Sequence, residues 1–373
     1  MYQSIYIAAT GQHVGKTTST LGLVAALKAA GLENLGYCKP MGQQLVKIKK
    51  MSVDKDAVLF SKIMGFELAA EIHSPATIGR GVTRAFLDNP EQFRFKERIL
   101  AAKRILEHRC DAIVYEGTGH PAVGSIVGLS NAQVAKILGA KVVIVLEGGI
   151  GNTLDRLDLC LSYFKASQVP VIGVIVNKVL PEKMELIKYY LTKRLDQINL
   201  PLLGLVPFDK SLSNPIMQTI SEAVKGRFVV NPQGFKNRVE AIIPGSLIDA
   251  IRRRKNPCNL LLLVSYKRAG EVLRQIEALS ERKRWTKVPL SGVILTEEDL
   301  LEKPLESYDI HMDYLMKHEI PVISTSYDTL GAYTKIDKIE VKINTATPWK
   351  VERANELIKQ HVQLDLLLDI LRH

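Results

Sequence analysis

The stretch that decides the fold is Thr10-Gly11-Gln12-His13-Val14-Gly15-Lys16-Thr17-Thr18. It follows a short apolar run, residues 4–9, and leads into residues 18–30, whose apolar side chains recur at helical spacing. A strand that runs through such a loop and Gly-Lys-Thr into a helix presents its backbone N–H groups to phosphate at the helix N-terminus. The strict pattern begins with Gly, whereas this chain has Thr10 there and the Gly one residue later.

This loop predicts a nucleotide site with ATP and Mg²⁺ as cofactors. Lys16 should bridge the β- and γ-phosphates, and Thr17 should be a ligand of Mg²⁺. The predicted nucleotide-binding residues of the loop are Gly11, Gln12, His13, Val14, Gly15, Lys16, Thr17 and Thr18. Gly-Lys-Thr-Thr can also open a helix by chance, but the strand before it and the helix after it favour a phosphate-binding loop.

Apolar runs rich in β-branched residues alternate with helical patterns through the first half of the chain. The runs cover residues 4–9, 112–115, 142–146, 171–176 and 202–206, and the helical patterns cover residues 21–30, 94–108, 132–138, 153–165 and 182–196. Strands that are apolar nearly throughout are typical of a parallel sheet with helices on both faces. We therefore predict an α/β fold with a doubly wound, mostly parallel sheet.

A second, smaller α/β domain is predicted because 373 residues exceed the usual size of one core. Residues 226–234, with Asn231-Pro232 between two glycines, are typical of a boundary. Beyond them we expect strands at 259–265, 291–296 and 321–324, helices at 268–279, 305–317 and 329–333, and a long terminal helix at 348–372. That helix should pack on the domain or on a partner. The predicted domains are residues 1–225, with a short helix near 216–223, and residues 235–373.

Three further polar residues stand at the ends of predicted elements. Glu116 ends the run 111–116, which places its carboxylate at the sheet edge where ligands bind; a helix cap or a surface Glu is the alternative. Asp56 opens a helical pattern, where it could bind a metal or cap the helix. Lys39 ends a predicted strand and could direct its charge at phosphates or at a substrate carboxylate, or be an ordinary surface lysine.

The dipeptide Asn177-Lys178 follows a predicted strand, as the base-reading Asn-Lys of some P-loop proteins does. A guanine reader of the N-K-x-D kind needs Asp two residues later, and this chain has Leu180 there. The sequence therefore favours adenine over guanine.

These motifs occur in the order seen in dethiobiotin synthetase, which roughly residues 1–222 resemble. The matching residues are Thr10 to Thr17, Tyr37-Cys38-Lys39-Pro40, Asp56-Ala57, Glu116-Gly117-Thr118-Gly119 and Asn177. The resemblance implies the P-loop NTPase fold of that branch. It also implies Lys16 on the phosphates, Lys39 near phosphate and substrate, Asn177 at the adenine, and Thr17, Asp56 and Glu116 around Mg²⁺.

Residues 223–373 resemble the DRTGG domain that follows a dethiobiotin-synthetase-like domain in long phosphate acetyltransferases and in free-standing two-domain proteins. The matching stretches are residues 292–296 and 321–329. Thr296-Glu297-Glu298 stands where the family motif has Thr-Gly-Gly, and Val46-Lys47-Ile48-Lys49-Lys50 stands where dethiobiotin synthetase has a substrate-binding loop. The resemblance therefore carries over neither the ligand of the second domain nor the substrate.

The leading interpretation is an ATP-binding protein, a weak Mg²⁺-dependent ATPase or a nucleotide sensor, whose second domain regulates or oligomerises it. The main alternative is an ATP-dependent ligase that phosphorylates a carboxylate or carbamate of a small metabolite. A cobyrinate-type amide synthase is disfavoured because Asn256-Pro257-Cys258-Asn259 lacks the turn that would present a Cys nucleophile. A partitioning ATPase would have to bind DNA through the basic runs.

The composition sets the expected partners. The formal charge of +11 is spread over both halves, and the basic runs at 47–50, 252–255 and 282–284 are not interleaved with aromatic residues. Solvated surfaces and phosphorylated small molecules fit this charge better than nucleic acid does. Four separated cysteines indicate neither zinc nor disulfides, and no apolar run reaches membrane-spanning length. We expect a cytoplasmic homo-oligomer with a nucleotide and a small carboxylate metabolite as ligands.

Overall fold

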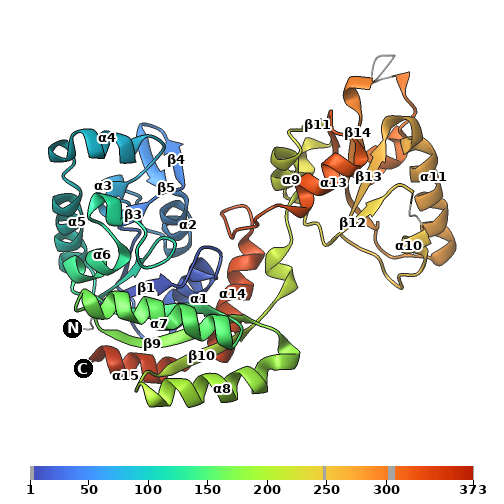
Figure 1. Ribbon diagram of the computed structural model, residues 1–373. Coiled ribbons are helices and arrows are strands. Elements are labelled where there is room, and N and C mark those ends of the chain that lie inside the picture. The colour runs from blue at the N-terminus through green and yellow to red at the C-terminus, as the bar shows by residue number, and fades with distance from the viewer. Residues whose placement is uncertain (1–3, 247–248, 301–306, 373) are drawn as a thin grey trace. The chain divides into compact units, whose positions relative to one another are not determined.

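The computed structural model describes residues 4–246, 249–300 and 307–372, which form two compact units (Figure 1). One unit is Met1–Asp209 together with Ile343–His373, and the other is Lys210–Lys342. Within the described residues, no helix combines the length and the apolar character needed to cross a membrane.

The first unit is built on a six-stranded sheet of order β10-β9-β8-β1-β7-β2. The strands are β1 (Ile5–Ala9), β2 (Leu35–Cys38), β7 (Ala112–Glu116), β8 (Lys141–Glu147), β9 (Val171–Val179) and β10 (Leu202–Pro207). All neighbouring strands are parallel. The predicted α/β fold with a doubly wound parallel sheet is confirmed, and the predicted strands all lie in it.

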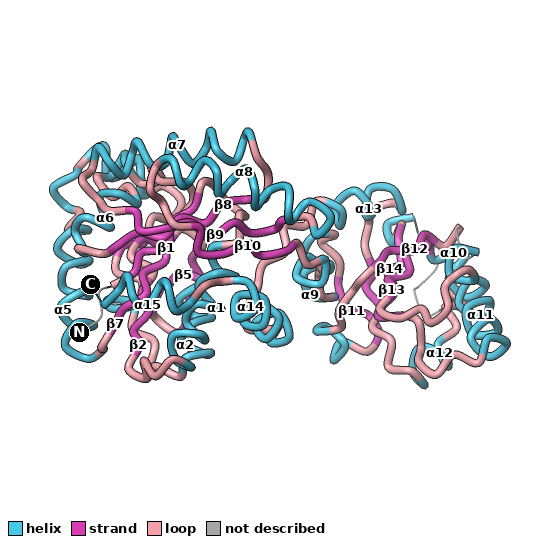
Figure 2. Tube along the Cα trace, turned by 90° about the horizontal axis from the view of Figure 1, so that it is seen from below, coloured by secondary structure: helices cyan, strands magenta, loops and turns pink. Residues whose placement is uncertain are grey.

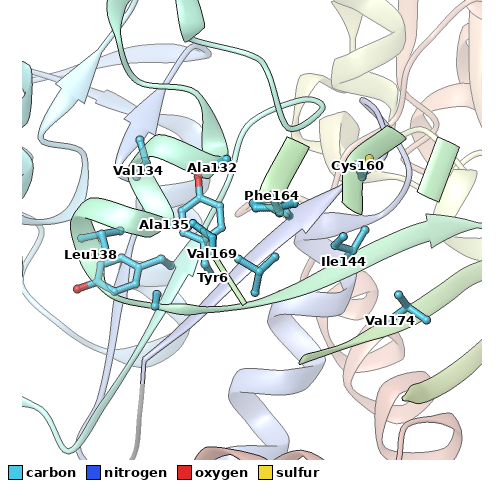
Figure 3. Close-up of a cluster of buried hydrophobic side chains, with 14 of the residues drawn as sticks. Tyr6, Ala132, Val134, Ala135, Leu138, Ile144, Cys160, Phe164, Val169 and Val174 are labelled. Atoms are coloured by element: carbon cyan, nitrogen blue, oxygen red, sulfur yellow. The ribbon is translucent and has the colours of Figure 1, made fainter. Parts of the chain in front are cut away.

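Helices cover both faces of this sheet, and every central strand is therefore buried on both sides. Figure 2 shows α7 (Gly151–Ala166) and α8 (Met184–Gln197) over one face, and α1 (Lys16–Ala29), α14 (Pro348–His361) and α15 (Leu364–Arg372) over the other. Helices α5 (Phe95–Arg109) and α6 (Asn131–Leu138) share the core of the first face, where Tyr6 and Ile144 pack against Phe164 (Figure 3).

Shorter elements lie between β2 and α5. They are β3 (Met41–Gly42) paired with β6 (Ala76–Thr77), the hairpin of β4 (Leu45–Ile48) and β5 (Met51–Asp54), and the helices α2 (Lys55–Met64), α3 (Ala70–His73) and α4 (Val82–Asp88). The basic run 47–50 covers the end of β4 and the two-residue turn of that hairpin.

The C-terminal residues differ from the prediction, because they belong to the first unit and form two helices instead of one. Ala354 and Ile358 of α14 are buried, and α14 lies against α1 (Figure 1). Between α14 and α15, the N–H of Gln363 donates to the carbonyl of Leu203 at 2.7 Å, which ends the first helix. The predicted second domain of residues 235–373 is therefore too long at its C-terminal end. The face of the first sheet that α1 covers also needs α14 and α15 to exclude water.

The second unit has a five-stranded sheet of order β11-β15-β14-β13-β12. Its strands are β11 (Arg227–Val230), β12 (Ala241–Pro244), β13 (Leu260–Ser265), β14 (Leu290–Thr296) and β15 (Val322–Ser324), of which only β11 is antiparallel to its neighbour. Its helices are α9 (Met217–Ala223), α10 (Asp249–Arg252), α11 (Tyr266–Lys283), α12 (Met312–Lys317) and α13 (Thr329–Asp337).

Two predictions at the start of this unit need correction. The segment predicted as a boundary, 226–234, contains the edge strand β11, and the helix predicted for the first domain, now α9, packs in the second unit's core. Residues 305 and 306 of the predicted helix 305–317 lie outside the described residues, and α12 covers its end.

Candidate nucleotide-binding site

The loop between β1 and α1 adopts a conformation that requires glycine at one position. Gly15 has φ 106° and precedes the first residue of α1. A Cβ at Gly15 would lie 1.8 Å from Nδ2 of Asn177. Only glycine fits here, because the left-handed backbone and the neighbouring amide both exclude a side chain.

Asn177 lies against this loop, at the end of β9. Its side chain is buried, and Nδ2 donates to the carbonyl of Val14 at 3.0 Å. Lys178 also contacts the loop, because its Nζ donates to the carbonyl of His13 at 2.5 Å. The Asn177-Lys178 pair found in the sequence therefore braces the loop, and a contact of Asn177 with adenine stays a prediction.

Lys16 links the loop to the segment that follows β7. Its ammonium donates to the carbonyl of Gly11 and to the carbonyl of Gly119, each at 2.9 Å. The loop and the Gly117-Thr118-Gly119 segment thus face each other, as expected for neighbouring strands whose carboxyl ends share one sheet edge.

Four of the predicted residues meet in one buried cluster. Nζ of Lys39 lies 2.7 Å from Oδ2 of Asp56 and 2.9 Å from Oε1 of Glu116. The hydroxyl of Thr17 donates to the same Oε1 at 3.0 Å. These side chains come from the ends of β2 and β7 and the starts of α1 and α2, so the sheet edge assembles them.

The cluster carries one ammonium and two carboxylates. Burial raises the pKa of Glu116, and the nearby Asp56 carboxylate adds to this although Lys39 opposes it. Burial lowers the pKa of Lys39, but the carboxylates of Asp56 and Glu116 outweigh it, so the net pKa lies above its usual value. The surplus negative charge suits an added cation, and so does the buried Oε2 of Glu116, which has no hydrogen-bond partner among the described residues.

The oxygen atoms of Thr17, Asp56 and Glu116 match the hard ligands that Mg²⁺ prefers. In the described part of the chain, no group of three or more His, Cys, Asp or Glu side chains could hold a metal ion. Since this set contains only two acids, Mg²⁺ here would depend on Thr17, on water and on nucleotide phosphates for its other ligands.

The alternative role of Asp56 as a helix cap is taken by Asp54. Oδ1 of Asp54 accepts from the N–H of Asp56 at 2.9 Å, and Oδ2 accepts from the N–H groups of Gln43 and Gln44 at 2.9 and 3.0 Å. Asp54 is the N-cap of α2, which leaves the carboxylate of Asp56 directed at Lys39. The sequence pattern 53–58 contains both acids and does not say which one caps.

Two further residues at the site were missed by the sequence analysis. Oδ1 of Asn131 accepts from the hydroxyl of Tyr6 at 2.7 Å and from the N–H of Thr118 at 2.9 Å, which fixes the segment after β7. Arg156 of α7 has Nη1 3.9 Å from the place where a Cβ on Gly11 would lie. Neither residue belongs to a motif, because each reaches the site from a helix distant in sequence.

The sequence profile of a family described as "AAA domain" matches residues 3–216. The chain belongs to this AAA domain family. The matched residues include the whole of the cluster and the phosphate loop. The AAA domain of this chain also ends close to the place where the first unit gives way to the second.

Relatives of this AAA domain protein include phosphate acetyltransferases and dethiobiotin synthetases. A phosphate acetyltransferase of Acinetobacter baylyi is 24% identical over 96% of this chain and 51% of its own length. An ATP-dependent dethiobiotin synthetase of Anaeromyxobacter dehalogenans is 28% identical over 48% of this chain and 78% of its own length. The resemblance to both groups is confirmed, and the chain spans about half the length of the phosphate acetyltransferases it matches.

Among solved structures, the MinD cell division protein of Aquifex aeolicus covers 57% of this AAA domain protein and 84% of its own chain, with 15% identity and a TM-score of 0.36. The matched relatives do not test the assignment of the second unit to a DRTGG domain, which stays a prediction.

Proposed function

We infer that the chain binds ATP with Mg²⁺ at this site and acts as a slow ATPase or a nucleotide sensor. The observation that carries the proposal is the buried Glu116, whose Oε1 accepts from Thr17 and Lys39 while Oε2 has no partner in the part of the chain that the structure describes. A buried carboxylate oxygen without a partner costs free energy, so its retention fits a site completed by a ligand.

The phosphate loop would bind the nucleotide through its backbone N–H groups and Lys16. Lys16 would exchange the carbonyls of Gly11 and Gly119 for phosphate oxygens, which are stronger acceptors. Thr17, Asp56 and Glu116 would hold Mg²⁺, which neutralises charge on the phosphates. Lys39 would turn from the two carboxylates toward the γ-phosphate or the substrate, since Mg²⁺ would take over its role in balancing their charge.

ATP is the preferred nucleotide in this proposal. Leu180 cannot accept the N–H groups of guanine that an Asp at this position would accept. Asn177 already donates its N–H to Val14, so its Oδ1 is the atom left to accept the amino group of adenine.

Glu116→Gln provides the main test, because it keeps the shape of the side chain and removes its charge. We expect ATP binding without metal to change little and the strengthening of ATP binding by Mg²⁺ to fall about tenfold. Isothermal titration with and without Mg²⁺ measures both. Lys16→Ala is the control, since it should weaken ATP binding both with and without Mg²⁺. An unchanged Mg²⁺ effect in Glu116→Gln would remove Glu116 from the metal site.

A ligase that phosphorylates a small carboxylate or carbamate is the second candidate. The dethiobiotin synthetase match and the buried Lys39 beside the phosphate loop favour it. The hairpin of β4 and β5 occupies the place of that enzyme's substrate loop, so the substrate would differ. Phosphate release that rises severalfold with one metabolite, and not with its ester, would favour the ligase over the ATPase.

The second unit would regulate the first or join copies of the chain. Light scattering of the full chain with and without ATP tests the homo-oligomer part. If the chain is a monomer both with and without ATP, the oligomerisation role is wrong and only the regulatory role of the second unit is left.

A further inference from the structure

The second unit contains a pocket of about 400 Å³ that the nucleotide site does not use. One side is α11, which contributes Arg268, Gln275, Ala278 and Arg282, and the other side includes Asp249 and Arg252 of α10. All of these described lining residues belong to the second unit.

The pocket brings together two basic runs that are far apart in the sequence. Arg252 belongs to the run 252–255, and Arg282 belongs to the run 282–284. Arg268, Gln275 and Arg282 follow each other at intervals of seven residues, which is about two helical turns, so they lie along one face of α11. The two end arginines are separated by roughly 21 Å of helix. The two arginines therefore lie toward opposite ends of the wall that α11 contributes.

The charge of the pocket is positive and only partly compensated. Asp249 lies 3.3 Å from Arg252 and is the only acid among the described lining residues. Within the described residues, neither Arg268 nor Arg282 forms an ion pair, whereas Arg274 on another face of the same helix pairs with Asp309. Guanidinium groups that face a hollow without acidic partners are suited to bind an anion from solution.

We propose that this pocket binds a phosphorylated small molecule of about nucleotide size with anionic groups at both ends. Arg268 and Arg282 would each hold one anionic group through paired N–H donors, with Arg252 on the opposite wall. The exposed Ala278 and the buried Leu279 add apolar lining that suits an uncharged middle part. The volume lies in the range of small-molecule sites, and the described lining residues include none of the aromatic side chains on which nucleic-acid bases stack.

Binding of 1,10-decanediol bisphosphate to the full chain tests the proposal, because this probe has a phosphate at each end of an uncharged linker. The phosphate loop also suits this anion, so every protein carries Lys16→Ala. We expect saturable binding in isothermal titration, weakened roughly tenfold by Arg268→Gln and by Arg282→Gln, since each removes charged hydrogen bonds. Lys267→Gln and Lys283→Gln are matched controls, because they remove the same charge from exposed neighbours on α11 that do not line the pocket. They should change the affinity by less than about twofold.

A second variant separates the effect of the pocket's space from the effect of its charge. Ala278→Phe fills the pocket at an exposed helix position and leaves every arginine in place, so it should also abolish binding. Thermal melts of all variants check that they are folded. Absent saturable binding, equal losses in pocket and control variants, or normal binding by Ala278→Phe would each overturn the proposal. A short oligonucleotide that binds more tightly than the bisphosphate, with equal losses in all arginine and lysine variants, would overturn it in favour of a nucleic-acid surface.

Discussion

Gly22 of α1 and Ile358 of α14 lie so close that a Cβ built on Gly22 would be 2.2 Å from the Cβ of Ile358. The two helices can cross at this distance only because position 22 has no side chain. The contact joins residues that are more than three hundred positions apart and seals one face of the first sheet. The phosphate loop opens α1, so the C-terminal helices support the element that presents the loop.

The first prediction concerns this helix crossing. Gly22→Ala should lower the free energy of unfolding by about 2–4 kcal/mol, because the added methyl group forces the two helices apart. Gly151→Ala is the matched control at the start of α7, where nothing lies within 4 Å of the added atom. It should be neutral or stabilising by up to about 1 kcal/mol. Urea unfolding of the two variants measures the difference, and equal stabilities would mean that α14 moves aside without cost.

The second prediction separates two neighbouring acids. Asp54→Ala should lower the free energy of unfolding by about 2–3 kcal/mol, since it removes the cap of α2 and the acceptor for Gln43 and Gln44. Asp56→Ala should change stability by less than about 1 kcal/mol, because Lys39 keeps Glu116 as partner. Urea unfolding without nucleotide measures both. A larger loss in Asp56→Ala than in Asp54→Ala would reverse the two roles.

The parts of the fold predicted from the sequence are those with local signals. The phosphate loop, the six strands of the first sheet and the places of Lys39 and Glu116 follow from apolar runs that end at polar residues. The position of Asn131, the choice of Asp54 as cap and the docking of α14 depend on contacts between distant segments, which leave no mark in a local pattern. The edge strand β11 begins at Arg227, directly after Gly226, and pairs on one side only, so its sequence resembles a linker.

The third prediction is a pH dependence set by His73. Burial lowers the pKa of His73 from about 6.5, and its ring stacks on Phe66 with centroids 4.1 Å apart. The folded state therefore binds a proton less readily than the unfolded state. The stability from this group is complete above pH 6.5 and is lost as pH falls through the lowered value.

His73→Gln should remove this acidic loss, so the free energy of unfolding should fall less between pH 7 and pH 5 than in the parent. Denaturant unfolding at several pH values measures the slope. His108→Gln, at an exposed position of α5, is the control and should keep the parent's slope. A parent slope that is unchanged in His73→Gln would assign the pH dependence to another group.

The last prediction concerns the two roles open to Asn177. The side chain donates to Val14 in the phosphate loop at 3.0 Å, and its remaining oxygen is free for adenine in the proposed complex. Asn177→Ala should lower the affinities for ATP and for GTP by about tenfold each, because the carbonyl of Val14 loses its donor and the loop becomes less ordered. If Oδ1 of Asn177 also accepts from adenine, the affinity for ATP should fall further than the affinity for GTP. Leu180→Asp is the companion variant, since it supplies the acceptor that guanine needs and should shift the ratio of GTP to ATP affinity toward GTP by about tenfold. Competition titrations with both nucleotides give the two ratios. GTP affinity unchanged in Asn177→Ala would contradict the bracing of the loop, and an unchanged ratio in both variants would show that neither residue reads the base.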